Sequence, residues 1–213
     1  MKRSFYPFFL LVAPLVVFAA TPIDGIYATG FVGYTYIPNN VNTSHNNIFY
    51  SDVHYQAGYD GGGSLGYRTN PLRYEAEISY FNANIHRFSQ DNVIQTQVSG
   101  YNNGILTLIN FAYEAPALIQ TLQPFVGIGI GYAWLNNQLN NTSTTDSSRY
   151  RIVSYGFAYQ GTVGIAYNLA ENYSLSVSYR YLGTPNVPQL GRTFQINLAN
   201  IAVTYRFDSA RYN

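Results

Sequence analysis

Hydrophobic and polar residues alternate one by one along most of the chain. The clearest stretch is Tyr173–Leu182, in which Leu, Val and Tyr occupy the odd positions while Ser and Arg occupy positions 174 to 180 on the other face. A period of two residues is that of a β-strand with one apolar face. Counting every segment of this kind predicts eight β-strands. The other seven are Ile26–Ile37, Gln56–Arg68, Arg73–Phe81, Ile105–Glu114, Phe125–Leu135, Tyr155–Asn168 and a final strand that ends at Phe207.

Three of these strands break the clean alternation. In the first, the otherwise polar face carries Tyr27 and Phe31, and in Ile105–Glu114 two Leu side chains fall on the polar face. In the last strand, Phe194, Ile196 and Leu198 are even-numbered, whereas the apolar residues from Ile201 onward are odd-numbered. This change of phase predicts a β-bulge or a switch from loop contact to lipid contact.

Short and long connections alternate between the strands. The short ones are Thr69–Leu72, Ala115–Gln123 and Leu169–Asn172. The long ones are rich in Asn, Ser, Thr and Gln. They are Pro38–His54, Asn82–Asn103, Asn136–Val153 and Gly183–Gly191. Tight turns at one end and long polar loops at the other are typical of outer-membrane barrels.

Composition narrows the class of protein. Only 10% of the 213 residues are charged, against about 25% in soluble domains, and 17% are aromatic, including 22 Tyr. The net charge of +1 and the lack of a basic cluster exclude a nucleic-acid binder. No apolar run after the first twenty residues reaches the ~18 residues of a membrane helix. The absence of Cys excludes disulfides, a thiol enzyme and a Cys-ligated metal.

The first twenty residues are predicted to be a secretory signal peptide. Lys2 and Arg3 precede an apolar stretch, and Val17-Phe18-Ala19 fits the small-x-Ala pattern before a cleavage site. We therefore expect export, with residues 21–213 forming one barrel domain. Without residues 1–20 the chain keeps nine Arg and ten acidic residues, a formal net charge of −1.

A lipid-facing barrel and a soluble barrel differ in which face of each strand, apolar or polar, points inward. The interior of eight strands is just wide enough for side chains, so Tyr and Trp from every strand would overfill it. The Gly-rich polar face is therefore expected to point inward and the aromatic face to meet lipid, with Tyr and Trp at the interfaces. The sequence predicts an all-β fold, an eight-stranded antiparallel up-and-down transmembrane β-barrel.

The chain resembles the small bacterial outer-membrane β-barrel family, of the type of the OmpA transmembrane domain and the opacity-like proteins. The likeness is carried by Pro124–Tyr132, Phe157–Gly161, Tyr179-Arg180-Tyr181 and Tyr205-Arg206-Phe207. It implies an outer-membrane location in a Gram-negative bacterium, outer-membrane lipids and lipopolysaccharide as surroundings, and insertion by the barrel-assembly machinery. In that family a closing aromatic residue is part of the insertion signal, which corresponds here to Tyr205 and Phe207.

Charged residues on the inward face form the candidate site. A charge enclosed in a narrow bore needs a partner, so Arg180 is predicted to pair across the lumen with Glu77, Asp60 or both. The structural interpretation is a plug that rigidifies the barrel, and the functional one is a gated path for small solutes. The predicted lumen network comprises Asp60, Arg68, Glu75, Glu77, Glu114, Arg180 and Arg206.

Catalysis and cofactors find little support in the sequence. His45, His54 and His86 fall in or beside the first two long loops, where ligands do not converge on a stable frame, so no metal or cofactor is expected. A third alternative is a lipid-modifying enzyme, which would need a His in the later strands. Those strands contain none. Polar loops on a rigid scaffold favour binding. The leading hypothesis is a structural and adhesin-like role toward a host-surface ligand, with a small porin-like channel as the alternative.

Overall fold

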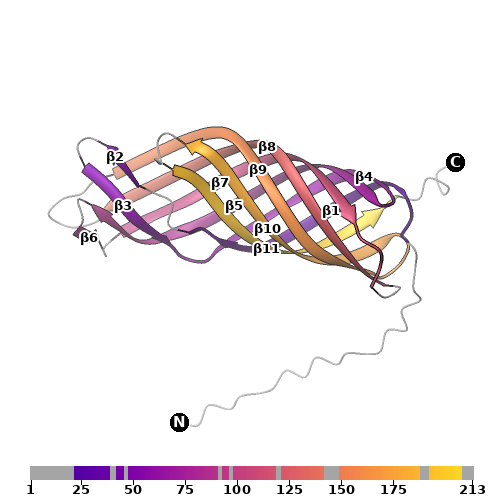
Figure 1. Ribbon diagram of the computed structural model, residues 1–213. Helices are drawn as coiled ribbons and strands as arrows, with labels where there is room; N and C mark the ends of the chain where they lie inside the picture. Colours follow the sequence, from indigo (N-terminus) through magenta and orange to yellow (C-terminus); the bar gives the residue numbers. More distant parts are fainter. Residues whose placement is uncertain are drawn as a thin grey trace, which may run out of the picture.

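The computed structural model shows a closed β-barrel of eight antiparallel strands (Figure 1). It describes residues 22–38, 42–45, 48–90, 93–95, 98–118, 121–141, 149–187 and 192–207. The predicted signal peptide, residues 1–20, lies outside the described residues. Within the described ranges no helix is long and apolar enough to cross a bilayer. The barrel strands are β1 (Gly25–Tyr36), β4 (Gly58–Thr69), β5 (Leu72–Gln90), β7 (Val98–Glu114), β8 (Leu122–Asn141), β9 (Arg149–Asn168), β10 (Tyr173–Val187) and β11 (Arg192–Arg206).

Strand pairing follows the chain and then closes the cylinder. Each barrel strand pairs with its neighbour in sequence, and β1 pairs antiparallel with β11, from Tyr27 opposite Arg206 to Tyr36 opposite Asn197. Three connections follow the ends of β4, β7 and β9: Asn70–Pro71, residues 115–121 and residues 169–172. They share one end of the barrel, here called the turn end, and the opposite end is the loop end. The predicted turn Ala115–Gln123 is shorter than expected because β8 already begins at Leu122.

The two faces of the wall carry the residues that the alternation predicts. The outward side chain of Val32 is 68% exposed, whereas that of Tyr27, on the inward face of the same strand, is 1% exposed. Leu106, Leu108 and Phe31 also point inward and are buried. The outward face is therefore apolar and aromatic on every barrel strand, as a lipid-facing surface requires.

The expectation of a bulge or a change of contact where the phase changes, between Leu198 and Ile201, is wrong; the register shift in this strand pair lies nearer the loop end, between Thr184 and Val187 of β10. β11 pairs with β10 in one continuous register from Thr184 opposite Phe194 to Tyr173 opposite Tyr205. All even-numbered residues of β11 from Phe194 to Arg206 are buried inside the barrel. The apparent change of phase arises because the inward face itself changes from polar near the turn end to apolar near the loop end.

The long connections are also shorter than predicted, because their Asn- and Ser-rich residues continue the strand ladders. β5 and β7 stay paired through Asn84 opposite Tyr101, and β8 and β9 through Asn140 opposite Arg149. Three further strands lie within two of these segments at the loop end. They are β2 (Asn42–His45), β3 (Ile48–Tyr55) and β6 (Val93–Gln95), of which β3 and β6 pair with β5.

The wall of the barrel is consequently uneven in height. β5, β7, β8 and β9 contain 17 to 20 residues each, whereas β1 and β4 contain 12. About 9–11 tilted residues cross a bilayer. The long strands therefore extend well beyond the membrane at the loop end, on the left of Figure 1, where β3 continues the line of β4 along β5. We call this extension the tall wall.

Inward glycines let neighbouring strands pack, and one of them gives a testable prediction. A Cβ on Gly131 would overlap the carbonyl oxygen of Thr107 in the β7–β8 ladder, whereas a Cβ on the outward Gly161 would meet nothing within 4 Å. Gly131→Ala should lower the free energy of unfolding by about 1–3 kcal/mol, because backbone must move. Gly161→Ala is the matched control and should be neutral. Urea titration followed by heat-modifiable gel mobility measures both, and equal effects would contradict the steric argument.

Candidate functional site in the barrel lumen

Charged residues near the turn end form a compact network, here called the turn-end cluster. Arg68 donates from Nε to Glu114 Oε2 at 2.8 Å and from Nη1 to Asp24 Oδ1 at 2.5 Å. Arg73 lies 3.6 Å from Glu114 and pairs with Glu75. Two guanidinium groups thus face three carboxylates; the Arg68 and Glu114 side chains are nearly inaccessible to solvent, whereas Asp24, just before β1, is half exposed. Paired, hydrogen-bonded charges are the form in which a narrow interior tolerates ions.

An aromatic residue holds this cluster together. The Tyr27 hydroxyl donates to Glu75 Oε1 at 2.6 Å and accepts a hydrogen bond from Arg73 Nε at 3.1 Å. The Arg73 guanidinium also lies 5.0 Å from the centre of the Tyr27 ring and 5.5 Å from that of Phe125, within cation–π range. Gly66 makes room for Tyr27, because a Cβ there would overlap the phenol ring.

Farther up the lumen, four side chains form a closed cycle of contacts, here called the polar ring. Arg180 forms an ion pair with Glu77, one of the two partners expected from the sequence. Glu77 Oε2 accepts from Asn110 Nδ2 at 2.8 Å, and Asn110 Oδ1 accepts from Gln160 Nε2 at 3.2 Å. Gln160 Oε1 accepts from Arg180 Nη2 at 2.6 Å, which completes the cycle. The ring ties β5, β7, β9 and β10 together across the bore.

The second partner considered for Arg180, Asp60, makes its hydrogen bonds elsewhere. Its carboxylate accepts from Asn200 Nδ2 at 2.5 Å and from the Thr35 hydroxyl at 3.3 Å, on the β1–β11 side of the lumen. Arg206, at the turn end, donates to Asn168 Oδ1 and to Ser174 Oγ at 3.2 Å each. The structure thus places all seven charged residues of the predicted network inside the barrel but divides them among separate groups.

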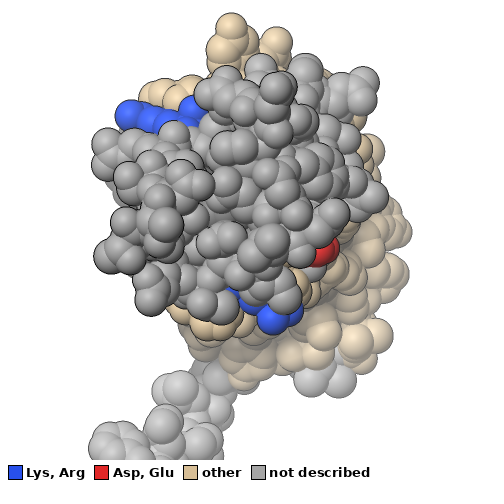
Figure 2. Space-filling model, turned by 90° about the vertical axis from the view of Figure 1, so that its left-hand side faces the viewer, with Lys and Arg blue, Asp and Glu red and all other residues tan. Residues whose placement is uncertain are grey.

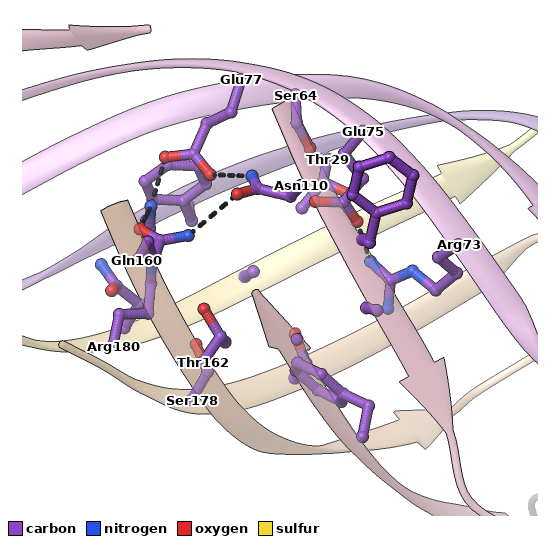
Figure 3. Close-up of a pocket in the computed structure, with 18 of the residues that line it drawn as sticks. Thr29, Ser64, Arg73, Glu75, Glu77, Asn110, Gln160, Thr162, Ser178 and Arg180 are labelled. Carbon is purple, nitrogen blue, oxygen red and sulfur yellow. Dashed lines mark hydrogen bonds and ion pairs between the residues drawn. The ribbon is translucent and has the colours of Figure 1, made fainter. Parts of the chain in front are cut away.

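A small cavity separates the turn-end cluster from the polar ring. Figure 3 shows Arg73 and Glu75 on one side of it and Glu77 with Arg180 on the other. Its volume is about 70 Å³, and hydroxyl groups line part of its wall. This space is sufficient for a few water molecules and far below the ~300 Å³ of a typical ligand pocket. The hydroxyl residues lining it are Thr29, Ser64, Thr162, Ser176 and Ser178.

Above the polar ring, toward the loop end, the lumen is filled by apolar side chains, here called the apolar plug. The Phe81 and Phe194 rings are fully buried and stack with their centres 6.2 Å apart. This finding corrects the expectation of a polar interior throughout. The other members of the plug are Ile37, Val53, Ala83, Ile85, Leu106, Leu108, Ala133, Leu135, Ala158, Leu182, Ile196 and Leu198.

Three members of the lumen network are missing from the sequence prediction: Arg73, Asn110 and Gln160. Arg73 adjoins the Asn70–Pro71 turn, but its odd number on β5 already places it on the inward face with Glu75 and Glu77. Asn110 and Gln160 are neutral, so only the strand register reveals that they bridge the Arg180–Glu77 pair. A search for every inward polar residue, charged or not, would have found all three.

The remaining predicted residues lie at the two ends. Tyr205 and Phe207 meet edge to face at 5.0 Å at the turn end, and the Phe207 N–H donates to Ile26 O at 2.9 Å. Their role in insertion stays a prediction. At the loop end, His54 Nε2 lies 3.1 Å from an Arg87 nitrogen, His86 contacts Gln56, and His45 falls within β2. Among the described residues, no three His, Cys, Asp or Glu side chains form a group suited to a metal ion.

The sequence match to known proteins agrees with this architecture. Residues 8–207 match the family described as outer membrane protein beta-barrel domain. The chain belongs to that family. Membership supports an outer-membrane location, and it orients the barrel, since such proteins have short periplasmic turns and longer external loops. The turn end is therefore periplasmic and the loop end external.

Individual relatives agree with the family assignment. An outer membrane protein of Gluconacetobacter diazotrophicus is 30% identical over 191 residues, covering 82% of this chain and 50% of the relative. An uncharacterised protein of Brucella abortus is 27% identical over 153 residues, covering 62% of this chain and 54% of that protein. The chain thus spans about half the length of the curated relatives it matches.

Solved barrels resemble the structure in fold. Neisserial surface protein A superposes with a TM-score of 0.56 at 14% identity, covering 86% of this chain and 97% of the other. The outer membrane protein OprG of Pseudomonas aeruginosa gives 0.59 at 11% identity, covering 90% and 99%. At these identities the likeness concerns the fold alone.

Proposed function

We propose that this protein is a non-enzymatic outer-membrane barrel whose external extension binds a partner at the cell surface, in the manner of an adhesin. The observation that carries the proposal is the tall wall, in which β5, β7, β8 and β9 continue for several residues beyond the span of the membrane. A sheet held by a rigid barrel presents side chains and backbone at low entropic cost. A barrel that only filled the membrane would not need it.

The filled lumen favours this role over that of a solute channel. The apolar plug, the polar ring and the turn-end cluster follow one another along the bore, and the cavity between the two polar groups is about 70 Å³. A porin needs a continuous aqueous path. Passage through this lumen would require Arg180 to leave Glu77 and the Phe81–Phe194 stack to open at the same time.

A shortened hairpin tests the proposal. Ile85 and Gly100 continue the register set by Asn84 opposite Tyr101, so residues 86–99 can be replaced by an Asn-Gly turn without disturbing the membrane strands. Whole bacteria that display the variant should bind immobilised extracellular-matrix proteins or cultured epithelial cells at least tenfold less than bacteria displaying the wild-type chain.

The control for this experiment keeps the hairpin and removes a lipid-facing side chain. Val203→Ala on β11 lies on the membrane face and should leave cell binding unchanged. Heat-modifiable gel mobility and surface labelling establish that all three chains are folded and exported in equal amounts. Equal binding by the shortened and wild-type chains, or no binding by either, would contradict an adhesin-like role of the tall wall.

A further inference from the structure

The membrane face of the barrel contains a groove on the side of the tall wall. Small side chains at Ala76 on β5 and Thr107 on β7 lower the surface there, between larger apolar neighbours. The hollow measures about 520 Å³, within the range of ~300–1,000 Å³ seen for ligand sites, and its lining is almost entirely apolar. Its apolar sides are formed by Ile109, Ile130, Tyr132 and Phe157.

An aromatic pair lies directly above this groove, toward the external end. Trp134 on β8 stands opposite Tyr155 on β9, and both point outward with 54% and 81% of their side chains exposed. Each of these residues is two positions nearer the loop end than Tyr132 or Phe157, which face each other in the groove. Trp and Tyr concentrate at the level where acyl chains give way to headgroups. The groove therefore lies at the depth of the outer leaflet.

A polar strip follows above the aromatic pair on the same strands. Arg151 Nε donates to Asn136 Oδ1 at 3.2 Å, and Asn136 Nδ2 donates to Asn103 Oδ1 at 3.2 Å. The chain of contacts runs along the outer face from β9 through β8 to β7. Arg151 is four residues beyond Tyr155, which is roughly 9 Å along the barrel axis for a tilted strand. That places an exposed guanidinium at the level of lipid headgroups.

Among the described side chains, the charge at this place is positive. On the outward face of β7, β8 and β9, Arg151 is the charged residue among the described side chains. At the external end, the described acidic side chain is Asp52, set against Arg87 and Arg151. Figure 2, which views this end, shows basic side chains at two separate places on its edge. An arginine favours phosphate and carboxylate groups, to which it can donate two parallel hydrogen bonds.

We propose that the groove and the polar strip together bind one phosphorylated, multiply acylated lipid of the outer leaflet, of the lipid A class. An acyl chain occupies the groove between Ile109 and Phe157, and a phosphate group accepts hydrogen bonds from Arg151. Asn136 and Asn103 offer amide groups to the sugar hydroxyls. The juxtaposition of groove, aromatic pair and arginine on the same neighbouring strands carries the inference, which does not depend on the adhesin-like role.

Trp134 provides a direct readout, because it is the one tryptophan of the chain and lies between the groove and Arg151. The full chain, folded in neutral-detergent micelles, is titrated with bis-phosphorylated lipid A while Trp134 fluorescence is recorded. Arg151→Gln should weaken binding at least tenfold, and Arg87→Gln, at the same end but away from the groove, should not. Ala76→Leu, which fills the floor of the groove, should weaken the binding of lipid A. The preference for phosphorylated over dephosphorylated lipid A should be unchanged in this variant.

Three further arms separate the sources of the signal. Dephosphorylated lipid A should bind at least tenfold more weakly than the bis-phosphorylated form, and millimolar inorganic phosphate should not displace the latter. Vesicles of phosphatidylethanolamine alone should give no saturable change. Equal affinity for phosphorylated and dephosphorylated lipid, equal loss in Arg151→Gln and Arg87→Gln, or full displacement by free phosphate would each overturn the proposal. Heat-modifiable mobility confirms that every variant is folded.

Discussion

Replacing Glu77 by Gln is expected to lower the free energy of unfolding of the barrel by about 3–5 kcal/mol. The change leaves the Arg180 guanidinium charged in a bore where its side chain is 5% exposed, and removing one partner of a buried ion pair costs this amount. Asn110 would lose a carboxylate acceptor as well. Urea titration of the folded chain in lipid vesicles, followed by heat-modifiable gel mobility, measures the loss.

Two companion variants make this prediction specific. The double variant Glu77→Gln with Arg180→Gln should recover much of the lost stability, because no charge then remains without its counterion. Glu171→Gln removes a carboxylate from an exposed periplasmic turn and should cost little. If Glu77→Gln is no more destabilising than Glu171→Gln, the polar ring does not stabilise the barrel.

Phe194→Ala is expected to destabilise the barrel by a similar amount, about 3–5 kcal/mol, by a different mechanism. The side chain is fully buried against Phe81, so its truncation removes apolar burial and leaves a void that rigid strands cannot close. Planar-bilayer recordings of wild-type and Phe194→Ala chains should show no steady ion current, since the polar ring and the turn-end cluster lie below the plug and still fill the bore.

The control for this variant lies on the opposite face. Phe111→Ala removes an aromatic ring from the lipid-facing side of β7, where acyl chains fill the space, and should cost clearly less than Phe194→Ala. A steady current through the wild-type chain would contradict the description of the lumen as filled. A current that appears only in Phe194→Ala would show that the polar ring alone does not close the bore.

The alternation of residues predicted the inward and outward faces because a β-strand repeats every two residues. It placed Arg180, Glu77 and Asp60 inside, along with Tyr27 and Phe31, which looked exceptional in the sequence. The same reasoning failed where the interior is not polar. In β11 the inward Phe194 and Ile196 resemble lipid-facing residues, and only their position in the closed barrel distinguishes the two.

The sequence did not predict which residues of the lumen pair with each other, and the reason is geometric. Whether Arg180 meets Glu77 or Asp60 depends on the stagger of strands far apart in the chain, which alternation within one strand does not define. The external ends of the strands were misassigned for a compositional reason. Asn- and Ser-rich residues beyond Asn82 are typical of loops, yet here they extend the β5–β7 ladder.

The contact between Glu77 and Arg180 joins residues 103 positions apart, one from the first half of the chain and one from the second. Glu77 therefore has no cation opposite it until β10 has been synthesised and seated. A chain interrupted after β9 would hold the Glu77 carboxylate on an incomplete cylinder, with Asn110 and Ser79 as hydrogen-bond donors but without its counterion Arg180. The charge of Glu77 is therefore balanced only once the penultimate strand is in place, next to the strand β11 that closes the barrel against β1.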